Sequence, residues 1–223
     1  MKEKRKDLTP PYARYLVHLT RPFPDFDFSF IKPVRQKAVE LLHLKQGDRV
    51  LDLGCGMGGS FQYLVRAVGA SGEVVGVEIS PEVAINARRR IERNKWTNVQ
   101  LIEADARAVH LTGTFDGALM FAAADVYGSQ QALDNIFPHL RDNARVVAFG
   151  AKTSSNRLGW ILNPFFRTAF SKLSFPTTPS IDYQPWRILA KYVEGLDVEE
   201  YFFGWMFLAS GSSLENVRGN DLS

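Results

Sequence analysis

The stretch VLDLGCGMGGS, Val50 to Ser60, decides how the chain is interpreted, because an apolar run leads into four glycines within six positions. Gly54, Gly56 and Gly59 fit G-x-G-x-x-G, the spacing of a loop that holds a dinucleotide pyrophosphate. With Asp52 in front, the same loop also fits D-x-G-x-G-x-G, which suits a ligand that has no phosphate there. The glycines alone leave both ligands open.

The composition is that of one large globular domain. The chain has 223 residues, of which 45% are hydrophobic and 23% charged, and its formal net charge is +3. Much of the positive excess lies in the N-terminal MKEKRK, which favours a solvated tail over a nucleic-acid surface. The single cysteine, Cys55, excludes an intrachain disulfide and a cysteine-based zinc cage. Since no signal peptide or membrane-spanning apolar run is visible, we expect a cytoplasmic protein.

Strand and helix patterns alternate along most of the chain. Predicted strands are 49–55, 72–80, 98–106, 115–123 and 144–152, and predicted helices are 34–44, 60–69, 81–94 and 129–140. This alternation predicts an α/β fold, a doubly wound parallel sheet with helices on both faces. A helix over 183–195 and two strands, 196–203 and 205–211, are expected to follow. Only Gly204 separates these strands, which predicts an antiparallel pair at the sheet edge.

Two irregular segments interrupt this pattern. Residues 1–33 contain several prolines and aromatics, and residues 153–182 are rich in aromatics, proline, serine and threonine. We expect both to pack over the ligand face of a single domain, 1–223. The first would be an N-terminal lid before a cofactor-binding core at 34–152. The second would be a cover before the closing helix and strand pair at 183–223.

Three acidic residues at strand ends distinguish between the candidate ligands. Asp52 would be repelled by a pyrophosphate but attracted to the ammonium group of an amino acid. Glu78 ends the second strand, where a carboxylate can accept both ribose hydroxyls of either candidate. Asp105 ends the third strand, where it could accept from an adenine amino group while the Ala106 N–H donates to a ring nitrogen. Asp52 and Asp105 could instead be capping side chains of their loops.

Together these motifs resemble the class I S-adenosylmethionine-dependent methyltransferases. VLDLGCGMGG, VVGVEIS, LIEADA, FDGALMF and RVVAFGAK occur in the order and spacing of that family, between Val34 and Lys152. The resemblance implies a Rossmann-like seven-stranded sheet, mostly parallel, with an antiparallel last strand. It implies S-adenosylmethionine as cofactor and S-adenosylhomocysteine as product. One departure is LRDNAR before the fifth strand, which we interpret as another turn.

The resemblance also implies a set of cofactor-binding residues. Asp52 and the loop Gly54–Gly58 would hold the methionine end, Glu78 the ribose, and Asp105 with Ala106 the adenine. Ile79 would pack on the adenine face, and the protein backbone near Phe121 and Ala122 would contact the methionine moiety. This set includes Gly54, Cys55, Gly56 and Gly58. PPYARY in the N-terminal segment resembles the family's lid, which makes Tyr12 and Tyr15 candidate lid contacts, with plain packing as the alternative.

Methyl transfer from a sulfonium requires alignment and a dry pocket more than a fixed catalytic residue. If the acceptor needs a general base, the candidates are Asp125, Tyr127 and His18. Asp125 could equally cap the helix that starts near Ser129. No metal site is predicted.

The aromatic-rich run Arg157–Phe170 favours a small, apolar acceptor such as a lipid, a quinone or an aromatic metabolite. It also indicates a peripheral membrane contact through 157–172, although a core-covering helix pair explains the run equally well. Nucleic acid is disfavoured because the adenine-N6 and cytosine-C5 motifs after strand four are missing. An NAD(P)-dependent oxidoreductase and a cofactor-binding protein without transferase activity are the alternatives, and no Tyr-x-x-x-Lys supports the former.

Overall fold

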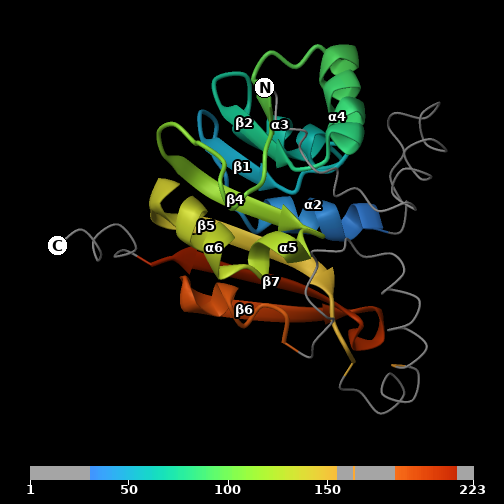
Figure 1. Cartoon of the computed structure of the whole chain (residues 1–223), viewed down its shortest axis with the longest axis vertical. Helices are drawn as coiled ribbons and strands as arrows, with labels where there is room; N and C mark the ends of the chain where they lie inside the picture. Colours follow the sequence, from blue (N-terminus) through green and yellow to red (C-terminus); the bar gives the residue numbers. More distant parts are fainter. Residues whose placement is uncertain (1–30, 155–162, 164–183, 215–223) are drawn as a thin grey trace, which may run out of the picture.

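The structure is a computed structural model that describes residues 31–154, 163 and 184–214. Seven strands within these ranges form one sheet with the order β3-β2-β1-β4-β5-β7-β6 (Figure 1). The strands are β1 Arg49–Leu53, β2 Glu73–Glu78, β3 Val99–Glu103, β4 Phe115–Phe121, β5 Leu140–Ala151, β6 Val193–Tyr201 and β7 Met206–Ser213. Strand β7 is antiparallel to both β5 and β6, so the predicted seven-stranded architecture is confirmed.

Helices cover both faces of the sheet. They are α2 Lys32–Glu40, α3 Phe61–Val68, α4 Pro81–Asn94, α5 Ala124–Tyr127 and α6 Gln130–Ile136, with 3₁₀ turns η2 Phe137–His139, η3 Leu189–Lys191 and η4 Phe202–Gly204. One apolar cluster joins the sheet to α2, α3 and α4, and a second joins it to α5, α6 and η3. The strands between these clusters are buried on both faces, which explains their continuous apolar sequences.

The carboxyl ends of the parallel strands meet at one edge of the sheet, where the glycine loop follows β1. Asp52 on β1 pairs with Gly76 on β2 and Leu119 on β4. Strand order reverses between β1 and β4, because β2 follows β1 on one side and β4 lies on the other. In an open α/β sheet this switch point is where ligands bind.

The predicted turn at LRDNAR is wrong, because these residues belong to β5. Leu140 pairs with Phe115 and Arg145 with Gly117, so six residues of β5 oppose three of β4. Asn143 takes up the extra length with φ 61°, a left-handed conformation that asparagine tolerates. The irregularity is therefore a bulge within the strand.

The predicted helix over 183–195 is also wrong. Among the described residues of this segment only η3 is helical, and β6 already begins at Val193. Trp186, Leu189 and Tyr192 all pack against the same apolar cluster. Their spacing of three matches the 3₁₀ period, in which side chains at i and i+3 are aligned. The sequence spacing was compatible with an α-helix, but packing selected the tighter turn.

We predict that Gly76→Ala lowers the free energy of unfolding by about 1–3 kcal/mol, the usual cost of overpacking a core. A Cβ at Gly76 would lie 2.6 Å from Cζ of Phe61 and 3.0 Å from Sγ of Cys55. Urea unfolding would measure the loss. Adding Phe61→Leu should recover part of it in the double variant, and strictly additive effects of the two substitutions would contradict this steric explanation.

Candidate active site

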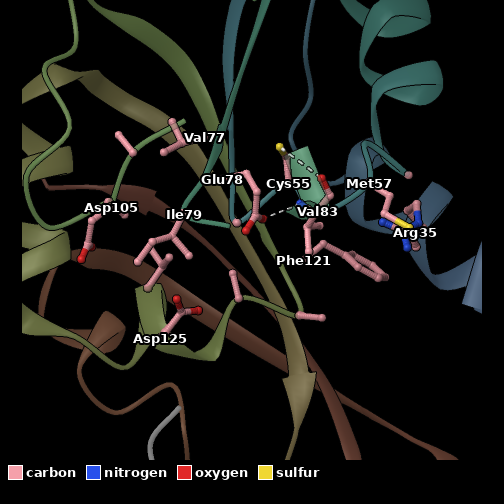
Figure 2. Close-up of a pocket in the computed structure, with 18 of the residues that line it drawn as sticks. Arg35, Cys55, Met57, Val77, Glu78, Ile79, Val83, Asp105, Phe121 and Asp125 are labelled. Atoms are coloured by element: carbon pink, nitrogen blue, oxygen red, sulfur yellow. Dashed lines mark hydrogen bonds between the residues drawn. The ribbon is translucent and has the colours of Figure 1, made fainter. Parts of the chain in front are cut away.

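A cavity of about 350 Å³ opens at the switch point, beyond the carboxyl ends of β1 to β4 (Figure 2). Its lining residues are Ile31, Arg35, Gly54, Cys55, Gly56, Met57, Gly59, Val77, Glu78, Ile79, Val83, Ala104, Asp105, Ala106, Phe121, Ala122, Ala123, Asp125 and Val126. Most of the predicted cofactor residues are therefore brought together here. Of the predicted set, Asp52 and Gly58 do not line the cavity, and Tyr15 lies outside the described residues, as does Tyr12.

The glycine loop lies close against the neighbouring strand. Gly54 has φ +65°, and a Cβ placed on it would lie 2.7 Å from Cβ of Ala123 after β4. Gly56 has φ +57° and faces open space, so its bare backbone borders the cavity. At Gly58 a Cβ would lie 2.6 Å from the ring of Phe61, so glycine makes room for that side chain. The loop thus brings main-chain groups, rather than side chains, to the ligand.

Glu78 joins the two loops that follow β1 and β2. Its Oε2 accepts a hydrogen bond from the Gly56 N–H and its Oε1 accepts one from the Ser80 N–H, both at 2.9 Å. The side chain is only 4% exposed. Burial raises the pKa of Glu78 to about 7, although the two backbone hydrogen bonds oppose the rise. Each oxygen keeps further acceptor capacity, so the carboxylate can still receive two hydroxyl groups.

Asp52 lies beneath the loop in β1 rather than on the cavity wall. It is 1% exposed, and its Oδ2 has no hydrogen-bond partner in the described part of the chain. Burial raises the pKa of Asp52 to about 7, the nearby Arg35 lowers it and Glu78 raises it further. A buried acceptor without a partner is costly. Its presence directly below a ligand loop fits a site completed by a ligand donor.

Arg35 on α2 is a cavity residue that the sequence analysis missed. Its Nη1 donates to Oγ of Ser60 at 3.0 Å, and its guanidinium carbon lies 4.1 Å from the centroid of the Phe121 ring. Phe121 in turn stacks on Phe149 with centroids 4.4 Å apart. This stack holds the cation at the end of the cavity opposite Asp105 (Figure 2). No local pattern marks Arg35, because its position depends on how α2 packs against the loop.

Asp105 lines the cavity, but Arg107 occupies its carboxylate. The Arg107 N–H donates to Oδ1 at 2.9 Å, and its guanidinium donates to both oxygens. Burial alone would raise the pKa of Asp105, yet the hydrogen bonds from Arg107 outweigh it and lower the pKa. Asp105 and Arg107 therefore form an ion pair within the connection between β3 and β4.

The three candidate bases are placed differently. Asp125 at the start of α5 lines the cavity, and burial raises its pKa. The position of Tyr127 contradicts the predicted role, because its ring is 2% exposed, packs against Phe207 and does not line the cavity. His18 lies outside the described residues. Burial also raises the pKa of the Cys55 thiol, which makes it a packing residue rather than a nucleophile.

The arrangement fits S-adenosylmethionine on its own geometry. Arg35 lies at one end of the cavity, and the acids Asp105 and Asp125 lie toward the other (Figure 2). The glycine loop also lines the cavity, and the Oδ2 of Asp52, which has no hydrogen-bond partner among the described residues, lies beneath this loop. No group of three metal-ligating side chains occurs among the residues described, and no helix there is long and apolar enough to cross a membrane.

We predict that the unliganded protein loses stability between about pH 4 and pH 7. Asp52 and Glu78 have folded pKa values near 7, above their ordinary values of 3.8 and 4.5, so the folded state binds more protons in this window. Rising pH therefore favours unfolding, by roughly 3–4 kcal/mol per group. Urea unfolding across this range would show the decline. Asp52→Asn should flatten it, and an equally steep decline in that variant would contradict the assignment.

Comparison with known proteins supports this interpretation of the site. Residues 50–143 match a protein family described as a methyltransferase domain. The 23S rRNA (uracil(1939)-C(5))-methyltransferase RlmD of Acinetobacter baumannii is 47% identical over 70 residues. That match covers 31% of this chain and 15% of the relative, so the chain spans only a small part of the relative's length.

Solved structures share the fold at low sequence identity. A SAM-dependent methyltransferase from Aquifex aeolicus has a TM-score of 0.63 and 18% identity, over 92% of this chain and 99% of that one. The Haemonchus contortus phospholethanolamine N-methyltransferase 2, solved with S-adenosylhomocysteine, has a TM-score of 0.70 and 14% identity, over 92% of this chain and 58% of that one. The first of these structures is named as a SAM-dependent methyltransferase and the second was solved with S-adenosylhomocysteine, in line with S-adenosylmethionine as the predicted cofactor. Residues 50–143 thus match a family described as a methyltransferase domain, and the sheet order agrees with the class I S-adenosylmethionine-dependent family that the sequence resembles.

Proposed function

We propose that the protein transfers the methyl group of S-adenosylmethionine to a small, apolar acceptor by in-line displacement. The observation that carries this proposal is the charge distribution along one cavity. Arg35 lies at one end, and Glu78, Asp125 and Asp105 follow toward the other (Figure 2). This distribution suits a ligand in which an amino acid is joined to a nucleoside. The match of residues 50–143 to a methyltransferase-domain family supports the same ligand.

Each end of the cavity offers matching partners for such a ligand. Arg35 would bind the carboxylate and Asp52 would attract the ammonium group, with Gly56 leaving room for close approach. Glu78 would accept the ribose hydroxyls. When bound, S-adenosylmethionine supplies a methyl carbon already activated by its sulfonium. The chain itself then needs to align the reactants and exclude water, so a fixed base is not required.

The apolar acceptor is favoured by the residues around Arg35. Ile31, Met57 and Phe121 line the cavity there, and the aromatic-rich run 157–170 is close in sequence to Ser154, which follows β5. RNA is a second candidate acceptor, because the relative that is 47% identical is named as an rRNA methyltransferase. Binding of the cofactor without methyl transfer is a third, since the cofactor and acceptor sites are separable.

We also propose a cytoplasmic protein with peripheral membrane contact through 157–172. Of this segment only Asn163 is described, and its side chain bonds to Ser154 after β5 and to Trp205 in the turn between β6 and β7. Its Oδ1 accepts from the Ser154 N–H and from Nε1 of Trp205, both at 3.1 Å. In the same turn the Phe203 side chain is 75% exposed. An exposed aromatic ring in this turn suits a lipid interface.

Calorimetry should detect S-adenosylhomocysteine binding to the wild-type protein and no tight binding of NADH. Glu78→Gln should weaken S-adenosylhomocysteine by about 1–3 kcal/mol, because the ribose loses a charged acceptor. Glu73→Gln is the matched control, since Glu73 lies at the opposite end of β2 and pairs with Arg49 at 2.6 Å. Tight NADH binding without S-adenosylhomocysteine binding would contradict the proposed function.

Release of S-adenosylhomocysteine should follow incubation with S-adenosylmethionine and a lipid, quinone or phenolic acceptor. With an acceptor embedded in phospholipid vesicles, Phe203→Ser should lower the rate several-fold, because the variant loses an apolar contact with the bilayer. The same variant should keep the wild-type rate on a detergent-dispersed acceptor. Activity restricted to rRNA fragments would refute the apolar acceptor, and equal vesicle rates would refute the membrane contact.

A further inference from the structure

Helix α4 contacts the glycine loop through one buried side chain, that of Arg90. Its Nη1 donates a hydrogen bond to the carbonyl oxygen of Gly58 at 3.0 Å. Arg90 is 3% exposed and does not line the cavity, so it is not itself a ligand contact. Burying a charge costs free energy even when its hydrogen bonds are satisfied, so the placement of a guanidinium behind the loop requires an explanation.

The carbonyl that Arg90 holds lies where the glycine loop passes into α3. It also accepts from the N–H of Phe61, the first residue of α3, at 3.3 Å, and the Gly58 N–H donates to the Cys55 carbonyl at 2.9 Å. Gly58 has φ +74°, which glycine adopts at little cost. Because glycines have many accessible backbone conformations, hydrogen bonds from outside the loop determine which one it keeps.

Fixing the Gly58 carbonyl also fixes the N–H of Gly59. The two groups belong to one trans peptide unit, in which the C=O and the N–H point in opposite directions. The Gly59 N–H therefore points away from Arg90, and Gly59 lines the cavity. Among the residues that the structure describes, none accepts a hydrogen bond from this N–H.

The Gly59 N–H lies at the end of the cavity that holds Arg35. A Cβ on Gly59 would lie 3.0 Å from the guanidinium carbon of Arg35. A main-chain donor and a guanidinium at the same end of a cavity suit a carboxylate. Glu78 acts elsewhere on the loop, because it accepts from the Gly56 N–H at 2.9 Å and would face the ribose. Arg90 and Glu78 thus fix different parts of the loop.

We propose that Arg90 is a positioning residue for the amino-acid part of S-adenosylmethionine. It holds the Gly58 carbonyl and so orients the Gly59 N–H for the carboxylate that Arg35 would bind. This inference rests on the proposed binding of S-adenosylmethionine. Arg90 acts through the loop, so it affects ligands that carry the amino-acid tail and leaves binding of the nucleoside part unchanged.

Calorimetry with S-adenosylhomocysteine and 5′-methylthioadenosine tests the inference, because the second ligand has the nucleoside and the sulfur but no amino-acid tail. Arg90→Met should weaken S-adenosylhomocysteine about tenfold, the value of a hydrogen bond to a charged group, and 5′-methylthioadenosine less than about twofold. Arg90→Lys keeps the charge but lacks the planar fork, so it should show the same selective loss to a smaller extent. Arg93→Met, at an exposed position of the same helix, is the matched control and should keep both affinities.

Two results would overturn the inference alone. One is an equal loss of affinity for both ligands in Arg90→Met, because Arg90 would then support the whole site rather than one end of it. The other is wild-type affinity for S-adenosylhomocysteine in both Arg90 variants. Thermal unfolding without ligand would show which variants fold, and if Arg90→Met does not, the same comparison in Arg90→Lys decides.

A wild-type protein that binds neither ligand would overturn the proposed function as well. Failure of the inference alone would leave tight S-adenosylhomocysteine binding to the wild-type protein intact.

Discussion

The cavity depends on one buried carboxylate, that of Glu78. By accepting the N–H groups of Gly56 and Ser80, it fixes the loop after β1 to the turn after β2. These two loops lie side by side because their strands are parallel neighbours in register. Without the carboxylate, the buried Ser80 N–H and the partly buried Gly56 N–H would lose their partner, and the glycine loop would no longer be fixed to the turn after β2. The cost is an acid whose charged form is destabilised by burial.

The opposite end of the cavity is built from parts that lie far apart in the sequence. Arg35 comes from α2 and rests on Phe121 of β4, which rests on Phe149 of β5. Lys37, two residues further along α2, pairs with Glu199 of β6 at 2.5 Å and ties the helix to the sheet edge. Helix α2 is thus anchored at two residues, Arg35 on Phe121 and Lys37 on Glu199. This anchoring holds the Arg35 guanidinium at the cavity.

The errors in the sequence analysis have a common physical origin. LRDNAR has the residues of a turn, yet pairing with β4 and β7 extends β5 through it and confines the turn-like geometry to Asn143. The segment 183–195 has apolar residues at a helix-like spacing, yet Trp186, Leu189 and Tyr192 pack at intervals of three. In both cases local propensity is weaker than the contacts made with distant strands.

The sequence by itself determined the sheet, its parallel core, the glycine loop and the acids that end β2 and β3, because hydrophobic period and strand-end residues are local signals. The tertiary structure alone decided which of those acids remain available to a ligand. Arg107 engages Asp105, Asp52 lies beneath the loop, Tyr127 turns into the core, and Arg35 and Asp125 reach the cavity. These outcomes depend on which side chains meet when separate elements pack, and on how burial redistributes charge and hydrogen bonds among them.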